Sequence, residues 1–325
     1  MEKVNLLILR HLEKEYVDQI SYLDPRLCVF DRSDPYRLGN YLPIDTDEIK
    51  DDYKKSEIIL AFWIPSNLLQ LAPNLKWLQL SSAGFEHLDE SIIRSPIKKT
   101  NSSGIHGIAM AEHILMFMLM FLRKAQDLLE WKSRHFWKFY IPGELRGRTI
   151  GIIGLGHIGL EVVNVVRGIG MKILVTDIIF PSLTKGVAGI ETTYPPPLMK
   201  EMLSKSDFVI ITVPQTKKTE GLIGEDELRS MKKSAYIINV SRGPIIDEKA
   251  LIKALEEGWI AGAGLDVFNN EPLPYDNKLW DFPNVIISPH IAGVSDQHDK
   301  RLTDLFCNNI IRYLNGEHLL NVLNR

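Results

Sequence analysis

Near the middle of the chain stands Thr149-Ile150-Gly151-Ile152-Ile153-Gly154-Leu155-Gly156-His157-Ile158-Gly159, a short apolar run that leads into the pattern G-x-G-x-x-G. A strand, a glycine turn and a helix in this order are typical of a dinucleotide-binding βαβ unit. The first glycine makes a tight turn, the second lets the backbone approach a pyrophosphate, and the third lets the helix close onto the strand. The N–H groups and the dipole of the helix start attract phosphate. We therefore expect the phosphates to be bound by Gly154, Gly156, His157, Ile158 and Gly159.

A carboxylate follows where the second strand of such a unit ends. Asp177 closes the apolar run 172–176 and lies 18 positions beyond Gly159, close to the usual offset of about 20 residues. A carboxylate there accepts hydrogen bonds from the adenosine ribose hydroxyls and repels a 2′-phosphate. The next residues, Ile178 to Pro181, offer no arginine to a 2′-phosphate. The sequence therefore predicts NAD as the cofactor, in preference to NADP.

The composition is that of an ordinary globular protein. A chain of 325 residues is long enough for two domains. Its 45% hydrophobic and 24% charged residues are average fractions for globular proteins. A net charge of −3 offers no basic stripe for nucleic acid, and the longest apolar run, Ile114 to Leu122, is nine residues, too short for a bilayer. The chain starts without a signal-peptide pattern, and its two cysteines, Cys28 and Cys307, fit neither a disulfide scaffold nor a metal site. We expect a cytoplasmic protein without a metal, a nucleic-acid partner or membrane association.

Short apolar runs alternate with helical or turn-rich spacers before the glycine loop, which predicts a small parallel α/β lobe. The expected strands are Val4–Leu9, Leu27–Phe30, Ile58–Phe62, Trp77–Leu80 and Ile97–Lys99. Ile105 to about Leu129 is predicted as one long helix. Because this helix is apolar around too much of its circumference for one core face, we expect it to pack on another subunit as well.

A last helix is predicted over residues 295–314. If it packs on the first lobe, that lobe is discontinuous. The domain organisation is then a substrate-binding lobe of residues 1–104 and 293–325, with a nucleotide-binding lobe of residues 105–292 inserted in it.

Three strand ends beyond the glycine loop carry side chains suited to an anionic substrate and a proton. Arg242 follows a buried strand, where ligands bind in doubly wound sheets, and its guanidinium can bind a carboxylate through two hydrogen bonds. Glu271 precedes a proline, and His290 follows another strand. If Glu271 accepts a hydrogen bond from the imidazole, it fixes the tautomer and favours the charged ring, which can then protonate a ketone oxygen. Alone, each residue is commonly an ion-pair, turn or loop residue; together, on successive strand ends, they favour catalysis.

These motifs resemble those of the D-isomer-specific 2-hydroxyacid dehydrogenases nearly from end to end. Besides the glycine loop, the resemblance covers Ser82–Asp89, Thr100–Gly104, Ala111–His113, Leu145–Thr149, Pro214–Thr219, Asn239–Ile246, Leu265–Phe268, Glu271–Pro272 and Ser288–Gly293. It implies an α/β protein with a Rossmann-type NAD-binding lobe inserted in a flavodoxin-like substrate lobe and a cleft between the lobes. It also implies a homodimer formed through the 105–140 region.

The resemblance further implies roles for individual residues. Arg242, Glu271 and His290 would be the catalytic set, and backbone N–H groups of Ala83 and Gly84 would help bind the substrate carboxylate. Asp266 would bond the nicotinamide carboxamide. The other residues expected at the cofactor are Pro214, Thr219, Val240, Ser241 and His290.

Two positions bear on the branch of the family. Glu86 stands where aspartate is frequent, which changes little because the backbone does the binding there. Formate dehydrogenases of this superfamily carry glutamine in place of the catalytic glutamate, so Glu271 argues against that branch.

The loop after the third strand of the first lobe, Phe62-Trp63-Ile64-Pro65-Ser66, carries no cation. A phosphorylated substrate such as 3-phosphohydroxypyruvate would need arginine or lysine there. Phosphoglycerate members also often continue into a C-terminal regulatory domain, whereas this chain stops at Arg325. We expect glyoxylate, hydroxypyruvate or a similar unphosphorylated 2-keto acid, with pyruvate and branched or aromatic 2-keto acids still open. Trp63 is a candidate to cap the substrate side chain and equally a candidate for packing within the lobe.

The leading hypothesis is therefore an NADH-dependent reductase similar to glyoxylate and hydroxypyruvate reductases. The alternatives are a phosphoglycerate dehydrogenase-like enzyme and an NAD-sensing binding protein like the C-terminal-binding corepressors, which carry extra tails. A hydrolase of the adenosylhomocysteine type would need other chemistry and a longer chain. The physiological substrate, the preferred direction and any assembly beyond a dimer stay open.

The segment Trp131 to Tyr140 is basic and aromatic. Its simpler interpretation is a packed excursion of the dimer arm. The sharper hypothesis is that Trp137 or a neighbour reaches the active site of the partner subunit and narrows it.

Overall fold

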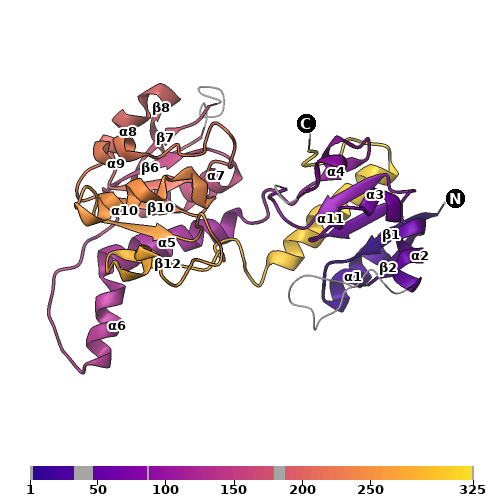
Figure 1. Ribbon diagram of the computed structural model, residues 1–325, viewed down its shortest axis with the longest axis horizontal. Coiled ribbons are helices and arrows are strands. Elements are labelled where there is room, and N and C mark those ends of the chain that lie inside the picture. The colour runs from indigo at the N-terminus through magenta and orange to yellow at the C-terminus, as the bar shows by residue number, and fades with distance from the viewer. Residues whose placement is uncertain (1–2, 33–46, 86–87, 179–186, 324–325) are drawn as a thin grey trace. The chain divides into compact units, whose positions relative to one another are not determined.

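The computed structural model describes residues 3–32, 47–85, 88–178 and 187–323. The chain divides into two compact units: the first is Met1–Ile105 together with Ser295–Arg325, and the second is His106–Val294 (Figure 1). Each unit contains a parallel sheet flanked by helices. The predicted fold class, two α/β lobes of which one is inserted in the other, is confirmed.

The first unit is built on a five-stranded sheet in the order β2-β1-β3-β4-β5, and every pairing in it is parallel. This order is typical of flavodoxin-like folds, in which ligands bind beyond the carboxyl ends of the strands where the order reverses, here between β1 and β3. The strands coincide with the five predicted apolar runs: β1 (Val4–Ile8), β2 (Leu27–Asp31), β3 (Ile58–Ala61), β4 (Trp77–Leu80) and β5 (Lys98–Thr100).

Helices cover both faces of this sheet. Along β1, Leu6 and Ile8 pack in one hydrophobic cluster with Phe306, while Leu7 packs in another with Tyr53. Because both faces are buried, the inner strand β3 is a continuous apolar run without polar alternation. Figure 1 shows the C-terminal helix, in yellow, beside the N-terminal elements of this unit. The helices are α1 (Lys14–Ser21), α2 (Asp47–Lys55), α3 (Leu68–Leu71), α4 (Glu90–Arg94) and α11 (His298–Leu314).

The second unit is built on a seven-stranded parallel sheet in the order β12-β11-β10-β9-β6-β7-β8. Counted from β6, this is the Rossmann order 3-2-1-4-5-6 with one further strand. The strands are β6 (Thr149–Ile153), β7 (Lys172–Thr176), β8 (Ile190–Tyr194), β9 (Phe208–Ile211), β10 (Tyr236–Asn239), β11 (Gly262–Leu265) and β12 (Val285–Ile287).

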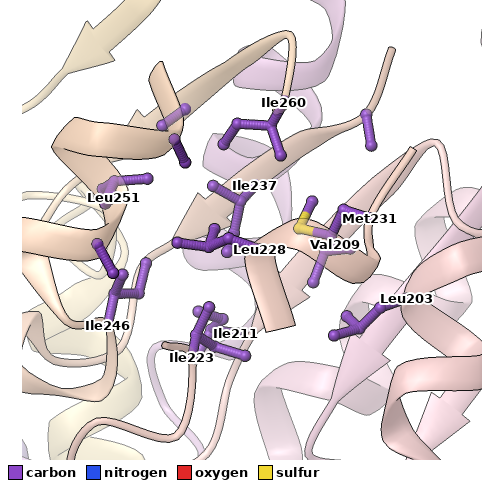
Figure 2. Close-up of a cluster of buried hydrophobic side chains, with 14 of the residues drawn as sticks. Leu203, Val209, Ile211, Ile223, Leu228, Met231, Ile237, Ile246, Leu251 and Ile260 are labelled. Carbon is purple, nitrogen blue, oxygen red and sulfur yellow. The ribbon is translucent and has the colours of Figure 1, made fainter. Parts of the chain in front are cut away.

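Helices of the second unit cover both faces of its sheet, apart from one helix that buries no residue and projects from the sheet. They are α5 (Gly107–Arg123), α6 (Ala125–Ser133), α7 (His157–Ile169), α8 (Met199–Lys205), α9 (Glu225–Ser230) and α10 (Glu248–Glu256), with 3-10 turns η1 (Pro196–Leu198), η2 (Gly243–Ile245) and η3 (Lys278–Asp281). Val209 and Ile211 of β9 point into the cluster drawn in Figure 2, whereas Phe208 and Ile210 pack in a second cluster. The sheet is thus rigid enough to fix the loops at its edge.

The single long helix predicted over Ile105 to Leu129 is wrong: α5 ends at Arg123 and α6 begins at Ala125. Lys124 between them has a left-handed backbone with φ 52°, so it cannot continue an α-helix. Lysine is a good helix former, which is why the sequence offers no warning of the break. Among the described residues, no helix has the length and the apolar character that crossing a membrane requires.

Asp299, in the first turn of α11, ties that helix to the loop after β1. Its Oδ1 accepts hydrogen bonds from Arg10 Nη2 at 2.7 Å and from His298 Nδ1 at 2.9 Å. Burial acts against the charge, but these hydrogen bonds outweigh it and lower the pKa of Asp299 to about 2. A carboxyl whose pKa is depressed stabilises the fold above its unfolded value of about 4 and loses this contribution as pH falls toward the folded value.

We therefore expect Asp299→Asn to lower the free energy of unfolding by about 1–2 kcal/mol at pH 7 and by about half of that at pH 3. Urea unfolding at both pH values measures the difference. Asp304→Asn, on the same helix, is the matched control, because the ion pair of Asp304 with Lys300 is exposed and should contribute below about 0.5 kcal/mol. Equal destabilisation by Asp299→Asn at both pH values would contradict the charge-based explanation.

Candidate active site

The three glycines of the loop between β6 and α7 differ in their surroundings. Gly154 has φ 100°, and a Cβ there would lie 2.8 Å from a methyl of Val213. A Cβ at Gly159 would lie 2.2 Å from the carbonyl oxygen of Gly154, which no side chain allows. At Gly156, by contrast, an added Cβ would meet nothing within 4 Å. The loop is therefore closed by two glycines and kept open by the third, as a backbone that receives a pyrophosphate requires.

Asp177 holds the glycine loop from the end of β7. Its Oδ2 accepts the backbone N–H of Leu155 at 2.7 Å. This bond places the carboxylate directly beside the loop, at the strand end where an adenosine ribose lies in such units. Ile178 beside it is 87% exposed. Ile179, Phe180 and Pro181, which were expected to offer no cation, lie outside the described residues.

Arg242 leaves the end of β10 in a fixed backbone. Asn239 Nδ2 donates to the carbonyl oxygen of Arg242 at 2.8 Å, and Asn239 Oδ1 accepts the N–H of Ser241 at 3.0 Å. The guanidinium donates through Nη1 to the carbonyl oxygen of Ser241 at 2.8 Å. Gly243 lies so close to Phe268 that a Cβ would be 2.0 Å from its carbonyl carbon. The arginine therefore stands at the carboxyl edge of the sheet on a backbone that cannot shift.

Four other predicted cofactor residues follow β10 and β9 at this edge. Val240 is 2% exposed and Ser241 7%, so both residues are buried. Thr219 closes the loop after β9, because its Oγ1 donates to the carbonyl oxygen of Pro214 at 2.7 Å and accepts the N–H of Thr216 at 2.8 Å. Contacts of these residues with a cofactor stay predictions.

His290 and Glu271 are brought together at the same edge. His290 Nδ1 lies 2.6 Å from Glu271 Oε2, while Glu271 Oε1 accepts the N–H of Phe268 at 2.9 Å. The two side chains are 48% and 35% exposed. Since Glu271 occupies the Nδ1 side, Nε2 is the nitrogen that can exchange a proton with a substrate.

Asp266 directly follows β11 and is buried, with 1% of its surface exposed. Its Oδ1 accepts from Ser288 Oγ at 2.5 Å and from the N–H of Ile291 at 2.9 Å, and its Oδ2 accepts the N–H of Ala292 at 2.9 Å. These bonds bind it to the loop that carries His290. The expected bond to a nicotinamide carboxamide stays a prediction. The sequence interpretation assigned no role to Ser288.

In the first unit, the loop after β4 carries Ala83 and Gly84. Asn101 Nδ2 donates to the carbonyl oxygen of Ala83 at 2.6 Å, and Ser82 Oγ donates to that of Gly84 at 2.7 Å. In a trans peptide the next N–H points opposite to the carbonyl, so the N–H of Gly84 is directed away from Asn101. This orientation suits an anion, and the side chain of Asn101 creates it. The sequence interpretation missed Asn101, since an asparagine in a loop has many ordinary uses.

Trp63 stands at the carboxyl end of β3, the strand beside β4. It is 43% exposed and makes an edge-to-face contact with Phe62, with ring centroids 5.5 Å apart. Trp63 thus presents apolar surface at the same edge of the first sheet as the loop of Ala83 and Gly84. Glu86, noted in the sequence, lies outside the described residues.

Known proteins similar to this chain belong to one family. The family described as D-isomer specific 2-hydroxyacid dehydrogenase, NAD binding domain, matches residues 115–292. A glyoxylate reductase of Thermofilum pendens is 39% identical over 288 residues, which are 85% of this chain and 83% of that protein. A glyoxylate reductase of Korarchaeum cryptofilum is 35% identical over 81% of this chain and 80% of its own.

Solved structures are similar over the whole chain. A D-isomer specific 2-hydroxyacid dehydrogenase family protein of Aeromonas salmonicida has a TM-score of 0.86 and 28% identity, covering 99% of both chains. A probable 2-hydroxyacid dehydrogenase of Rhizobium etli, solved with NADP, has a TM-score of 0.78 and 25% identity, covering 100% of this chain and 98% of its own.

Proposed function

The chain belongs to the D-isomer-specific 2-hydroxyacid dehydrogenase family, and we propose that it is an NADH-dependent reductase of a small unphosphorylated 2-keto acid, such as glyoxylate or hydroxypyruvate. The product is the corresponding 2-hydroxy acid, which has the D configuration where C2 is a stereocentre. The observation that carries the proposal is the His290–Glu271 pair, joined at 2.6 Å at the edge of the sheet that also bears the glycine loop. The relatives named glyoxylate reductase support the substrate class.

Separate residues are proposed to transfer the proton and to bind the substrate carboxylate. NADH bound at the glycine loop would supply the hydride that the keto carbon requires. His290, protonated and oriented by Glu271, donates a proton from Nε2 to the keto oxygen, so that the carbonyl becomes a hydroxyl. Arg242 binds the substrate carboxylate through its guanidinium, and the N–H groups of Ala83 and Gly84 bind carboxylate oxygen. In the reverse direction His290 takes the proton back.

NAD fits the loop better than NADP. The carboxylate of Asp177 is fixed beside the glycine loop by its bond to Leu155 N at 2.7 Å, so a 2′-phosphate there would meet a negative charge. The open side of Gly156 leaves room for the pyrophosphate. We propose that Gly154, Gly156, His157, Ile158, Gly159 and Asp177 bind the adenosine diphosphate half, and that Pro214, Thr219, Val240, Ser241, Asp266 and His290 lie toward the nicotinamide.

A panel assay tests this proposal. NADH oxidation is followed with glyoxylate, hydroxypyruvate, pyruvate, phenylpyruvate and 3-phosphohydroxypyruvate, with NADPH as the comparison cofactor. We expect turnover of the small unphosphorylated acids and a clear preference for NADH. The highest kcat/KM with 3-phosphohydroxypyruvate would favour the phosphoglycerate dehydrogenase alternative, and tight NADH binding without turnover would favour the corepressor-like one. Equal use of NADPH would contradict the role of Asp177.

The loop after β3 bears on the side chain of the substrate. No lysine or arginine lies in Phe62–Ser66, which disfavours a phosphate there. Trp63 is exposed enough to cap a short side chain, and one methylene changes binding by only about 1–3 kcal/mol. The change in the order of preference that Trp63→Ala causes within the panel therefore measures the contribution of this residue.

We also propose a homodimer formed through the 105–140 region. The outer stripe of α5 exposes Ile108, Met116 and Leu119, each by 41–44%, and Figure 1 shows α6 and the loop after it projecting from the second sheet. Further exposed side chains on this arm are Leu129, Phe136, Trp137, Phe139 and Ile141. Several large apolar side chains exposed on one helix and on the segment that follows it are typical of an interface.

Light scattering of the purified protein is expected to give twice the chain mass, and Met116→Asp should shift it toward the monomer. Leu198→Asp is the control, because Leu198 is equally exposed, at 43%, and lies outside this region.

Trp137→Ala should raise the KM for the keto acid if Trp137 reaches the partner's active site. An unchanged KM and substrate profile would leave Trp137 as an interface residue only.

The proposed location is the cytoplasm. Both cysteines, Cys28 and Cys307, are free, and burial raises the pKa of the Cys307 thiol to about 11, which keeps it unreactive. Free thiols are typical of a reducing compartment.

A further inference from the structure

A chain of hydrogen bonds links helix α5 to the loop that carries His290. His113 Nε2 lies 2.9 Å from Ser288 Oγ, and Ser288 Oγ lies 2.5 Å from Asp266 Oδ1. The three residues come from separate elements: α5, the end of β12 and the end of β11. All three are largely buried, with side-chain exposure of 12% for His113 and 1% for Asp266. Hydrogen bonds between buried groups are strong and fix geometry.

The direction of each bond follows from the number of protons. A carboxylate only accepts, so the single hydroxyl proton of Ser288 goes to Asp266. The remaining partner of the Ser288 oxygen, His113 Nε2, must therefore donate. This defines His113 as the tautomer with its proton on Nε2. Burial lowers the pKa of His113, against the opposing charge of Asp266, and so favours the neutral ring.

The far end of the chain is a turn that needs support. His290 has a left-handed backbone with φ 54°, a conformation that costs a residue with a side chain roughly 1–2 kcal/mol. The N–H of His290 donates to the carbonyl oxygen of Asp266 at 2.9 Å, and the next two N–H groups, of Ile291 and Ala292, donate to its carboxylate. Asp266 thus holds three successive backbone donors. A rotation of its carboxylate would release two of them.

We propose that His113 is a positioning residue for proton transfer: by donating to Ser288 it fixes the Asp266 carboxylate, which in turn holds the His290 turn against Glu271. This inference rests on the proposed function, because it assigns the support of the same proton donor. His113 touches neither the substrate nor the reacting atoms, and its effect passes through two other side chains.

Simple packing is the competing explanation. The ring of His113 makes an edge-to-face contact with Phe117, with centroids 4.6 Å apart. Packing and hydrogen bonding can be separated with two substitutions. His113→Phe keeps an aromatic ring against Phe117 and removes the donor, whereas His113→Gln removes the ring and keeps an N–H at nearly the position of Nε2. Packing predicts that phenylalanine is tolerated better; the proposal predicts the opposite.

Steady-state kinetics with glyoxylate and NADH give the first test. We expect His113→Phe and Ser288→Ala each to lower kcat about tenfold, with the KM for NADH within about twofold, because a displacement of 1 Å at a reacting group costs up to about a hundredfold. His113→Gln should stay within about threefold of the wild type. The double variant His113→Phe/Ser288→Ala should lose no more than either single variant, since both remove the same interaction. Wild-type kcat in His113→Phe, or additive losses in the double variant, would overturn the proposal.

Hydrogen exchange gives a test that does not depend on turnover. In the wild type and in His113→Gln, the amides of Ile291 and Ala292 should be protected, and in His113→Phe and Ser288→Ala they should exchange at least about tenfold faster. Ser288→Ala removes one hydroxyl only and serves if His113→Phe does not fold. Unchanged exchange of these amides in Ser288→Ala would overturn the positioning role of His113, whether or not the protein reduces a 2-keto acid. A wild type that reduces no member of the 2-keto acid panel would overturn only the proposed function.

Discussion

His290→Ala is expected to lower kcat for 2-keto acid reduction by about 10³-fold while leaving the dissociation constant of NADH within about twofold. A positioned general acid contributes roughly 10²–10⁴-fold, and alanine removes the only imidazole that the structure holds at the Glu271 carboxylate among the described residues. The affinity for NADH should change little, because the phosphates and the ribose of the cofactor are expected to bind at the glycine loop and at Asp177. NADH oxidation measures the first quantity, and a fluorescence titration of NADH measures the second.

Two further variants make this result specific. Glu271→Gln keeps the imidazole but removes the carboxylate that orients it, so its loss of kcat should be clear and smaller than that of His290→Ala. His318→Ala, at an exposed histidine of the first unit, should have no effect. Substantial turnover by His290→Ala would place the proton donor elsewhere, and a loss confined to NADH affinity would make His290 a cofactor residue only.

Much of the fold could be predicted because parallel strands buried on both faces are short apolar runs that stand out between helices. Inner strands of both units, such as β3 and β9, follow such runs, whereas the edge strand β8 (Ile-Glu-Thr-Thr-Tyr) does not. The glycine loop could be predicted for a different reason. Local backbone contacts, such as that between Gly159 and the carbonyl of Gly154, require glycine at fixed positions. Lys124 shows the limit, since its left-handed backbone is imposed by tertiary packing and leaves no mark in the residue type.

The site could not be predicted where it depends on the orientation of a backbone or side-chain group. Which way a carbonyl points decides whether the N–H of Gly84 can meet an anion, and that depends on Asn101, which is 18 positions from Ala83. The chain from His113 to Ser288 joins residues 175 positions apart. Such pairs come together through the sheet order, so a single sequence names the residues and leaves their contacts unknown.

Gly156→Ala should weaken NADH binding by about a hundredfold without destabilising the protein. The added methyl meets nothing within 4 Å, and the backbone at Gly156, with φ −76° and ψ −164°, is open to alanine. The free energy of unfolding should therefore stay within about 0.5 kcal/mol. The same open space is where the pyrophosphate must approach the helix start, and a methyl there would displace it from the N–H groups of α7. Losing one or two charge-assisted hydrogen bonds, at about 1.5–3 kcal/mol each, accounts for the expected factor.

Neighbouring glycines supply the controls. Gly168→Ala, on the exposed side of α7, also places a methyl in open space, so it should leave NADH affinity unchanged and stabilise the helix by about 0.5–1 kcal/mol. Gly159→Ala should destabilise the protein itself by about 2–3 kcal/mol, because its Cβ would lie 2.2 Å from the carbonyl oxygen of Gly154. A calorimetric titration with NADH and a urea unfolding curve for each variant separate the two effects. Unchanged affinity in Gly156→Ala would mean that the pyrophosphate does not lie against this loop, and the assignment of the whole cofactor site would then be wrong.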